Sequence, residues 1–113
     1  MKRSQQTLLS QEQSLQLSTL GNSLAQSRIA RRMTQAEVAV RANLSRNTVS
    51  RIENGDPGIA IGQILRYLDI VRAGATLADA LNKKDNAVSA LEAMNQPRRA
   101  SPLSDKELEE YDF

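Results

Sequence analysis

The chain has 113 residues, a formal net charge of +2 and an aromatic content of 3%. This length allows one small domain with tails and a modest core, which a homodimer would enlarge. Without Cys or His, the sequence excludes Cys-based zinc sites, thiol nucleophiles and imidazole acid–base catalysis. It has no motif for an enzyme, a metal or a cofactor, and no apolar run long enough to span a membrane. We therefore expect a cytoplasmic bacterial protein that is not an enzyme and has an aliphatic core.

The charge is divided between a basic body and an acidic end. Residues 1–100 carry 14 basic and eight acidic side chains, a net charge of +6. Residues 101–113 carry one basic and five acidic side chains, a net charge of −4. A basic body favours binding to phosphate, which supplies most of the sequence-independent affinity for DNA.

Residues 1–17 are rich in Gln and Ser and show little periodicity. We expect a flexible N-terminal arm, with Lys2 and Arg3 as alternative contacts to the DNA backbone or a minor groove. Ser18 is placed to cap a first helix with a buried stripe through Leu20 and Leu24.

Basic residues gather at the end of this first helix. Arg28, Arg31 and Arg32 lie there, where positive charge interacts favourably with the helix dipole. Arg31 and Arg32 are also candidates for contacts to DNA phosphates.

Residues 35–54 have the pattern of two short helices that pack on each other. Thr34 and Glu37 form a capping box that can start the first of them. Asn43 tolerates the left-handed conformation that a tight turn requires, and Ser45 can cap the second helix, which ends at an Asn-Gly-Asp-Pro cluster. The apolar positions fit this hairpin, with a small residue where the helices approach: Val38, Ala39, Ala42, Leu44, Val49 and Ile52. This is a helix-turn-helix pattern.

The second helix of this motif leaves polar side chains facing outward. Arg can bond the edge of guanine, Asn the edge of adenine, and Ser either a base or a phosphate, so Arg46, Asn47, Ser50 and Arg51 suit the major groove of DNA. The alternative is a solvated polar face, which is common on helical hairpins. The complete spacing of caps, turn and apolar positions favours the DNA-binding interpretation.

From about residue 20 to residue 71, the sequence resembles the Cro/C1-type helix-turn-helix family, also called the XRE family, which includes lambdoid phage repressors. The matching positions are Leu20-Gly21, Leu24, Arg28, Thr34-Gln35, Glu37-Val38-Ala39, Leu44-Ser45, Thr48 to Gly55 and Ile64-Leu65. Asn43 stands where the family usually has glycine. The resemblance implies that Arg28 pairs with Glu53 in a structural role, and that the loop after the motif touches phosphate, with Gly55 and Gly62 as candidates.

Two groups of DNA-binding residues are predicted. Arg46, Asn47 and Arg51 are expected at base edges. The residues expected to contact phosphates or to orient the reading helix are Gln35, Ser45, Thr48, Ser50 and Asn54, together with Arg31 and Arg32 from the first helix.

A further helix over residues 61–71 should close the core. The segment that follows it, residues 75–79, allows two interpretations: a helix capped by Thr76, as in a generic phage-type repressor, or a short strand that pairs across a dimer, as in HipB-like antitoxins, which the sequence resembles there. We favour the strand slightly. Either way, Thr76, Leu77 and Ala78 are expected at a dimer interface.

The C-terminal part predicts a weak helix over residues 83–94, a linker with two prolines and an acidic tail. Tyr111 and Phe113 at its end could anchor a protein partner, although a disordered tail with incidental rings is equally consistent. HipB-like antitoxins use an aromatic C-terminal tail to engage a HipA-type kinase toxin, and these two rings fit that role by type.

We therefore predict an all-α, five-helix, lambda-repressor-like domain, with a short C-terminal strand pairing across the homodimer as an option. Residues 1–17 would be the arm, residues 18–82 the DNA-binding and dimerisation domain, and residues 83–113 the extension. The predicted function is a repressor that binds a palindromic operator and acts as antitoxin of a HipA-like toxin, autoregulating its operon at the nucleoid. The alternatives are a stand-alone phage-type or restriction-system regulator, and a protein whose main role is to neutralise a partner.

Overall fold

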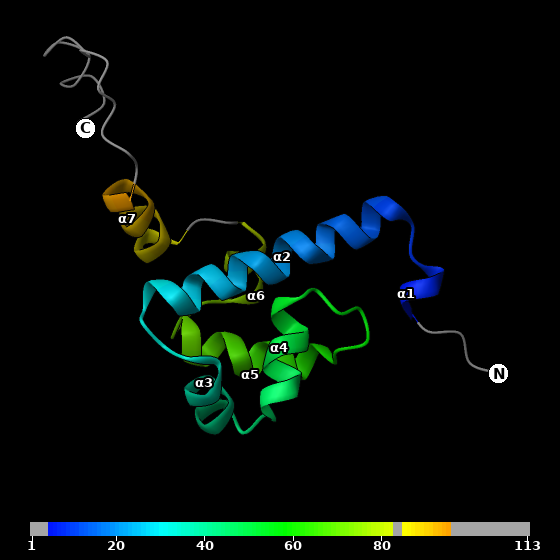
Figure 1. The fold of residues 1–113 in the computed structure, drawn as a ribbon, viewed down its shortest axis with the longest axis horizontal. Helices are drawn as coiled ribbons and strands as arrows, with labels where there is room; N and C mark the ends of the chain where they lie inside the picture. Colours follow the sequence, from blue (N-terminus) through cyan, green and yellow to red (C-terminus); the bar gives the residue numbers. More distant parts are fainter. Residues whose placement is uncertain (1–4, 83–84, 96–113) are drawn as a thin grey trace, which may run out of the picture.

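The computed structural model describes residues 5–82 and 85–95, which form seven helices and no strand (Figure 1). The helices are α1 (Gln5–Leu8), α2 (Gln11–Ala30), α3 (Gln35–Ala42), α4 (Arg46–Glu53), α5 (Ile61–Val71), α6 (Leu77–Leu81) and α7 (Asn86–Asn95). The predicted all-α class is confirmed, and α2 to α6 correspond to the five expected helices. Within the described residues, no helix is long and apolar enough to cross a membrane.

The first long helix begins eight residues earlier than predicted. Ser10, not Ser18, is its cap: the Ser10 hydroxyl accepts a hydrogen bond from the Gln13 amide at 3.0 Å, and the Gln13 side chain returns one to the Ser10 amide at 3.0 Å. This capping box satisfies two of the free amides at the helix start. Residues 11–17, which we assigned to a flexible arm, therefore belong to α2, and α1 lies before them.

Helices α3 and α4 form the predicted helix-turn-helix. The Thr34–Glu37 capping box starts α3, and Asn43 ends it in the left-handed conformation, with φ 55° and ψ 48°. The Ser45 hydroxyl then accepts the Thr48 amide at 3.0 Å and starts α4. Each of these local predictions is confirmed.

The core lies where α2, α3, α4 and α5 meet. Its fully buried side chains include Val38, Val49, Leu68 and Val71, as their helical spacing predicts. Tyr67 is also fully buried and is the largest side chain among them, so the prediction of a purely aliphatic core is wrong. The ring fits because its hydroxyl finds polar partners inside the core.

The option of a strand over residues 75–79 is also wrong, because this segment enters the helix α6. The Thr76 hydroxyl accepts the Asp79 amide at 3.1 Å, and the Asp79 carboxylate accepts the Thr76 amide at 2.8 Å. This capping box holds the turn in a helical conformation, and Ala80 is then buried against the core.

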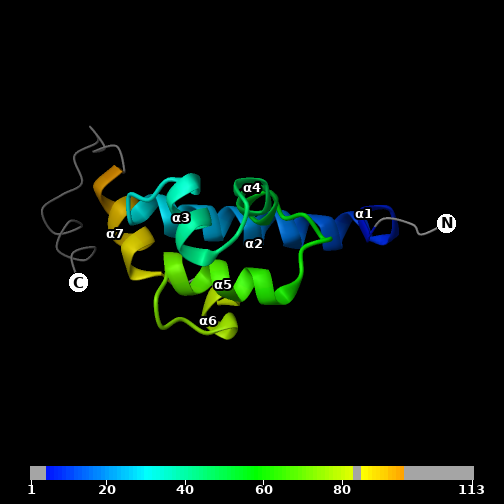
Figure 2. The same cartoon turned by 90° about the horizontal axis from the view of Figure 1, so that it is seen from below.

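Helix α2 crosses the end of α4 at very short range. A Cβ atom on Gly21 would lie 2.6 Å from the Glu53 carbonyl oxygen and 2.7 Å from the Ile52 carbonyl oxygen. Only glycine allows this approach. Figure 2 shows the resulting layers, with α4 on one side of the molecule and α5 and α6 on the other.

Helix α7 lies where the weak C-terminal helix was predicted, and it packs on the end of α2 (Figure 1). The buried Asp85 carboxylate joins the two helices: it accepts the Ser27 hydroxyl at 2.6 Å and Arg31 Nη1 at 2.8 Å, and it caps α7 through the Ala87 amide at 3.1 Å. The predicted linker and the tail with Tyr111 and Phe113 lie outside the described residues.

Candidate nucleic-acid interface

The inner end of α4 is fixed by one carboxylate, that of Glu53. Arg28 donates to both of its oxygens, from Nε to Oε2 at 2.6 Å and from Nη2 to Oε1 at 3.0 Å. The predicted Arg28–Glu53 pair is therefore confirmed. Gln35 Nε2 donates to Oε1 at 2.9 Å, and the Tyr67 hydroxyl lies 2.6 Å from Oε2. Donors from α2, α3 and α5 thus hold the last residue of α4.

These donors keep Glu53 ionised although it is largely buried. Burial opposes the charged carboxylate, but the hydrogen bonds from Arg28, Tyr67 and Gln35 outweigh it and lower the pKa of Glu53. The same contact raises the pKa of Arg28, while burial and the neighbouring carboxylate raise that of Tyr67. The anchor of α4 is therefore charged across the physiological pH range.

The N-terminal end of α4 presents polar groups to solvent. Arg46 and Asn47 are exposed, and neither side chain forms a hydrogen bond or an ion pair within the described residues. Thr48 and Ser50 are half-buried on the same helix. The Ser45 hydroxyl is used by the cap and also lies 2.8 Å from that of Thr48, so these two residues orient the start of α4.

Arg51, predicted at a base edge, forms an ion pair with the loop after α4. Its Nε donates to Asp56 Oδ2 at 2.7 Å, and the other oxygen of Asp56 accepts the Gly58 amide at 2.7 Å. Hydrogen bonds from Arg51 and from the Gly58 amide lower the pKa of Asp56. The Arg51 side chain is still 42% exposed. Its guanidinium is thus held by Asp56 and remains partly accessible to solvent.

The two arginines that follow α2 differ in their surroundings. Arg31 donates to both Asp85 oxygens, at 2.8 and 3.0 Å, and to the Ser27 carbonyl at 3.0 Å. Its guanidinium is thus engaged in an ion pair within the fold. Arg32 is exposed, and its backbone has a left-handed φ of 57°, a conformation that favours glycine. Of the two, Arg32 is the one that forms no ion pair within the described residues.

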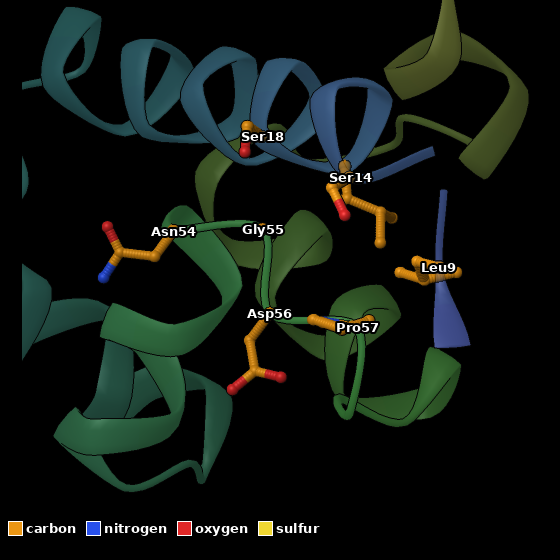
Figure 3. Close-up of a pocket in the computed structure, with 8 residues that line it drawn as sticks. Leu9, Ser14, Ser18, Asn54, Gly55, Asp56 and Pro57 are labelled. Carbon is orange, nitrogen blue, oxygen red and sulfur yellow. The ribbon is translucent and has the colours of Figure 1, made fainter. Parts of the chain in front are cut away.

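The remaining phosphate candidates lie at the ends of the motif. Gln35 stands at the start of α3 and already donates to Glu53. Asn54 is exposed at the end of α4, with a long 3.4 Å contact from Nδ2 to the Ser50 hydroxyl, and Figure 3 shows its side chain pointing away from Ser14 and Pro57. Gly62 is exposed in the first turn of α5.

The predicted dimer residues are only partly available. The Thr76 hydroxyl is used as a helix cap, Leu77 is half-buried and Ala78 is exposed. Sequence reasoning missed a groove between α2 and α6, whose apolar lining comes from Leu15, Leu20, Ala80 and Leu81. Leu15 is 66% and Leu81 60% exposed. Recognition of the Ser10 cap would have placed Leu15 on a helix and suggested this surface.

The described residues contain no cluster of acidic side chains that could hold a metal ion. A family model described as a helix-turn-helix domain matches residues 19–81, more than half of the chain. No curated protein and no solved structure matches the sequence.

Proposed function

Because this chain belongs to the helix-turn-helix domain family and is a DNA-binding transcriptional regulator of the XRE-like kind, we propose that it represses transcription as a homodimer on a palindromic operator. The observation that carries the proposal is the contrast between the two ends of α4. Its C-terminal end is held by three donors to Glu53, while Arg46 and Asn47 at its N-terminal end stand exposed. A rigid helix with free bidentate donors fits the major groove.

In this proposal, Arg46 and Asn47 bind base edges, and the surrounding groups bind phosphate. Arg51 contacts phosphate while it remains paired with Asp56, and Arg32 supplies an exposed positive charge beside the motif. Ser45 and Thr48 orient α4, while Gln35, Ser50 and Asn54 offer further polar contacts at its flanks. Two copies related by a two-fold axis would place their α4 helices about 34–36 Å apart, one turn of B-DNA.

The homodimer is proposed to form through the groove between α2 and α6. Leu15 and Leu81 flank this groove, and its rim is polar, with Glu12, Gln16 and Thr19. An apolar centre with a polar rim is the usual anatomy of a protein interface. Leu77 and Ala78 lie on α6, the helix that contributes Ala80 and Leu81 to this groove. Light scattering should show a dimer that Leu15→Gln/Leu81→Gln dissociates, whereas Val40→Gln, on the 82% exposed Val40 of α3, should leave it intact.

The DNA-binding role is tested with a duplex selected from a random-sequence pool and an unrelated duplex of equal length. Arg46→Ala should weaken binding to the selected duplex by about 1–3 kcal/mol and relax the preference at one base pair. Arg66→Ala removes the same charge from an exposed residue of α5 and should affect both duplexes alike. Equal losses of Arg46→Ala on the two duplexes would contradict base reading.

A role as antitoxin of a HipA-like kinase toxin is the second candidate. The acidic C-terminal segment with Tyr111 and Phe113 favours it, because two of the three rings in the chain stand in the last three positions. The helical α6 favours the alternative, a stand-alone phage-type or restriction-system regulator, since the strand that resembled HipB-like antitoxins is absent from the described residues.

Deletion of residues 101–113 separates these candidates. Operator binding should survive the deletion in every case. An antitoxin should lose affinity for a kinase-like toxin encoded beside it, and a protein that chiefly neutralises a partner should bind that toxin more tightly than DNA. A neighbourhood without such a reading frame supports the stand-alone regulator.

A further inference from the structure

The start of α2 faces the loop that follows α4 across a small pocket. Leu9, Ser14, Leu17 and Ser18 line one wall, and residues 54–57 line the other (Figure 3). The matched helix-turn-helix region begins only at residue 19, so the first wall lies outside it. A segment added in front of the family domain therefore borders the loop to which we assign phosphate contacts.

The two walls touch through their backbones at Gly55. This residue has a φ of +73°, and a Cβ atom on it would lie 2.5 Å from the Leu17 carbonyl oxygen and 2.7 Å from the Ser18 nitrogen. No other residue type could occupy this position without moving α2 or the loop. Figure 3 shows Gly55 directly beneath the turn of α2 that carries Ser18.

The loop is closed by hydrogen bonds among its own residues. The Asp56 amide donates to the Arg51 carbonyl at 3.0 Å, and the Asp56 carboxylate accepts both Arg51 Nε and the Gly58 amide. All of these bonds lie between residues 51 and 58. They set the shape of the loop, and Gly55 within it lies against the backbone of α2.

The supporting wall has its own sequence signals. The Ser10 capping box starts α2 well before the matched region. Two added helical turns would be marginal on their own, so they need tertiary contacts. Leu9 and Leu17 are half-buried beside the loop, whereas Leu8 and Leu15 are exposed and Leu15 borders the groove with α6.

We propose that residues 9–18 brace the loop of residues 54–58 and thereby position its phosphate-binding groups, with Leu9 and Leu17 as positioning residues. The inference rests on the proposed DNA binding and adds to it a determinant outside the family domain. Since phosphate contacts carry no sequence information, the brace sets affinity for all duplexes and leaves base preference unchanged.

The test compares two pairs of equal substitutions in the full chain. Leu9→Ala/Leu17→Ala alters the wall that faces the loop, and Leu8→Ala/Leu65→Ala makes the same chemical change at two exposed positions outside both the loop and the groove between α2 and α6. The first pair should speed hydrogen exchange of the Gly55 and Asp56 amides by about tenfold, through easier local opening. It should also weaken binding to the selected and to the unrelated duplex by the same factor. The slope of affinity against salt concentration should fall by about 1, which corresponds to the loss of one phosphate contact.

The control pair should leave both exchange and DNA affinity at the level of the natural sequence. The proposal is overturned if the two pairs behave alike, or if the first pair changes neither exchange nor affinity. Should Leu9→Ala/Leu17→Ala fail to fold, Ser10→Ala loosens the same end of α2 by removing its cap, with the same expected direction for both readouts. Faster exchange in a chain whose natural sequence binds no duplex would uphold the brace and reject the proposed function.

Discussion

The Tyr67 hydroxyl on α5 lies 2.6 Å from Oε2 of Glu53, the last residue of α4. The same oxygen accepts a hydrogen bond from Nε of Arg28 on α2, so α4 is tied to two other helices through a single atom. The Tyr67 ring is completely buried, which leaves its hydroxyl no access to water. The core and the anchor of α4 are therefore one structure, and changes in this part of the core should be felt at the DNA-binding face.

Tyr67→Phe tests this link. The substitution keeps the ring but removes the hydroxyl, so Glu53 loses one of its donors inside the core. We expect the free energy of unfolding to fall by about 1.5–3 kcal/mol, the range for a hydrogen bond to a charged group. Urea denaturation followed by circular dichroism measures it. An unchanged stability would mean that Arg28 and Gln35 satisfy the carboxylate without the tyrosine.

Asp85→Asn tests the carboxylate that docks α7 on α2. The Arg31 guanidinium, helped by the Ser27 hydroxyl and opposed by burial, holds the pKa of Asp85 below its usual range. A carboxylate with a lowered folded pKa stabilises the protein fully above its unfolded pKa of about 4, and this contribution is lost as the pH falls further. The variant should therefore lose about 2 kcal/mol at pH 7.

The difference in free energy of unfolding between Asp85→Asn and the natural protein should become smaller between about pH 5 and pH 2. In this range the Asp85 carboxylate of the unfolded natural chain becomes protonated, and its stabilising contribution to the fold is progressively lost. Unfolding curves of both proteins across this range provide the measurement. Asp79→Asn is the comparison at an exposed site: hydrogen bonds from the Thr76 backbone and side chain, helped by the charge of Arg72, also lower the pKa of Asp79, but screening by solvent should make its loss of stability smaller. A difference for Asp85→Asn that does not depend on pH would exclude the ionised carboxylate as its cause.

Local signals in the sequence predicted the helix-turn-helix well. Thr34, Asn43 and Ser45 each act on backbone groups within three or four residues, and their residue types identify the cap or the turn. The Ser10 cap follows the same rule but lay in a segment rich in Gln and Ser, where its Gln partner was not recognised. Thr76 is a further local signal of this kind. Its capping box with Asp79 starts the helix α6 in the segment where the resemblance suggested a strand.

Long-range contacts could not be predicted in the same way. The partner of Arg31 is 54 positions away, and nothing in the residue type separates an arginine that pairs with Asp85 from one that binds phosphate. Tyr67 could have been placed in the core from its spacing of three from Ile64 and four from Val71, but its bond to Glu53 depends on how α4 and α5 pack. Only the packed structure shows which charges remain free.

Gly21→Ala tests the close crossing of α2 and α4. The new methyl group would lie 2.6 to 2.7 Å from three backbone atoms of residues 52–55, none of which can move without displacing α4. We expect a loss of about 1–3 kcal/mol, as for other overpacked sites. Gly62→Ala is the matched control: nothing lies within 4 Å of its Cβ, so the higher helix propensity of alanine should stabilise the protein by up to about 1 kcal/mol. Thermal unfolding of the two variants should shift in opposite directions.

Arg32→Gly separates the effect of this residue on fold stability from its proposed contact with DNA phosphate. Arg32 occupies a left-handed conformation at the end of α2 where glycine is preferred, so the substitution should stabilise the fold by about 1 kcal/mol. If the exposed charge contacts phosphate, the same change should weaken binding to the selected and to the unrelated duplex equally. The slope of affinity against salt concentration should fall by about 1.

Asn43→Gly is the control, since Asn43 shares the left-handed conformation but carries no charge. It should change stability by only a few tenths of a kcal/mol. A more stable Arg32→Gly protein with unchanged DNA affinity would remove Arg32 from the interface.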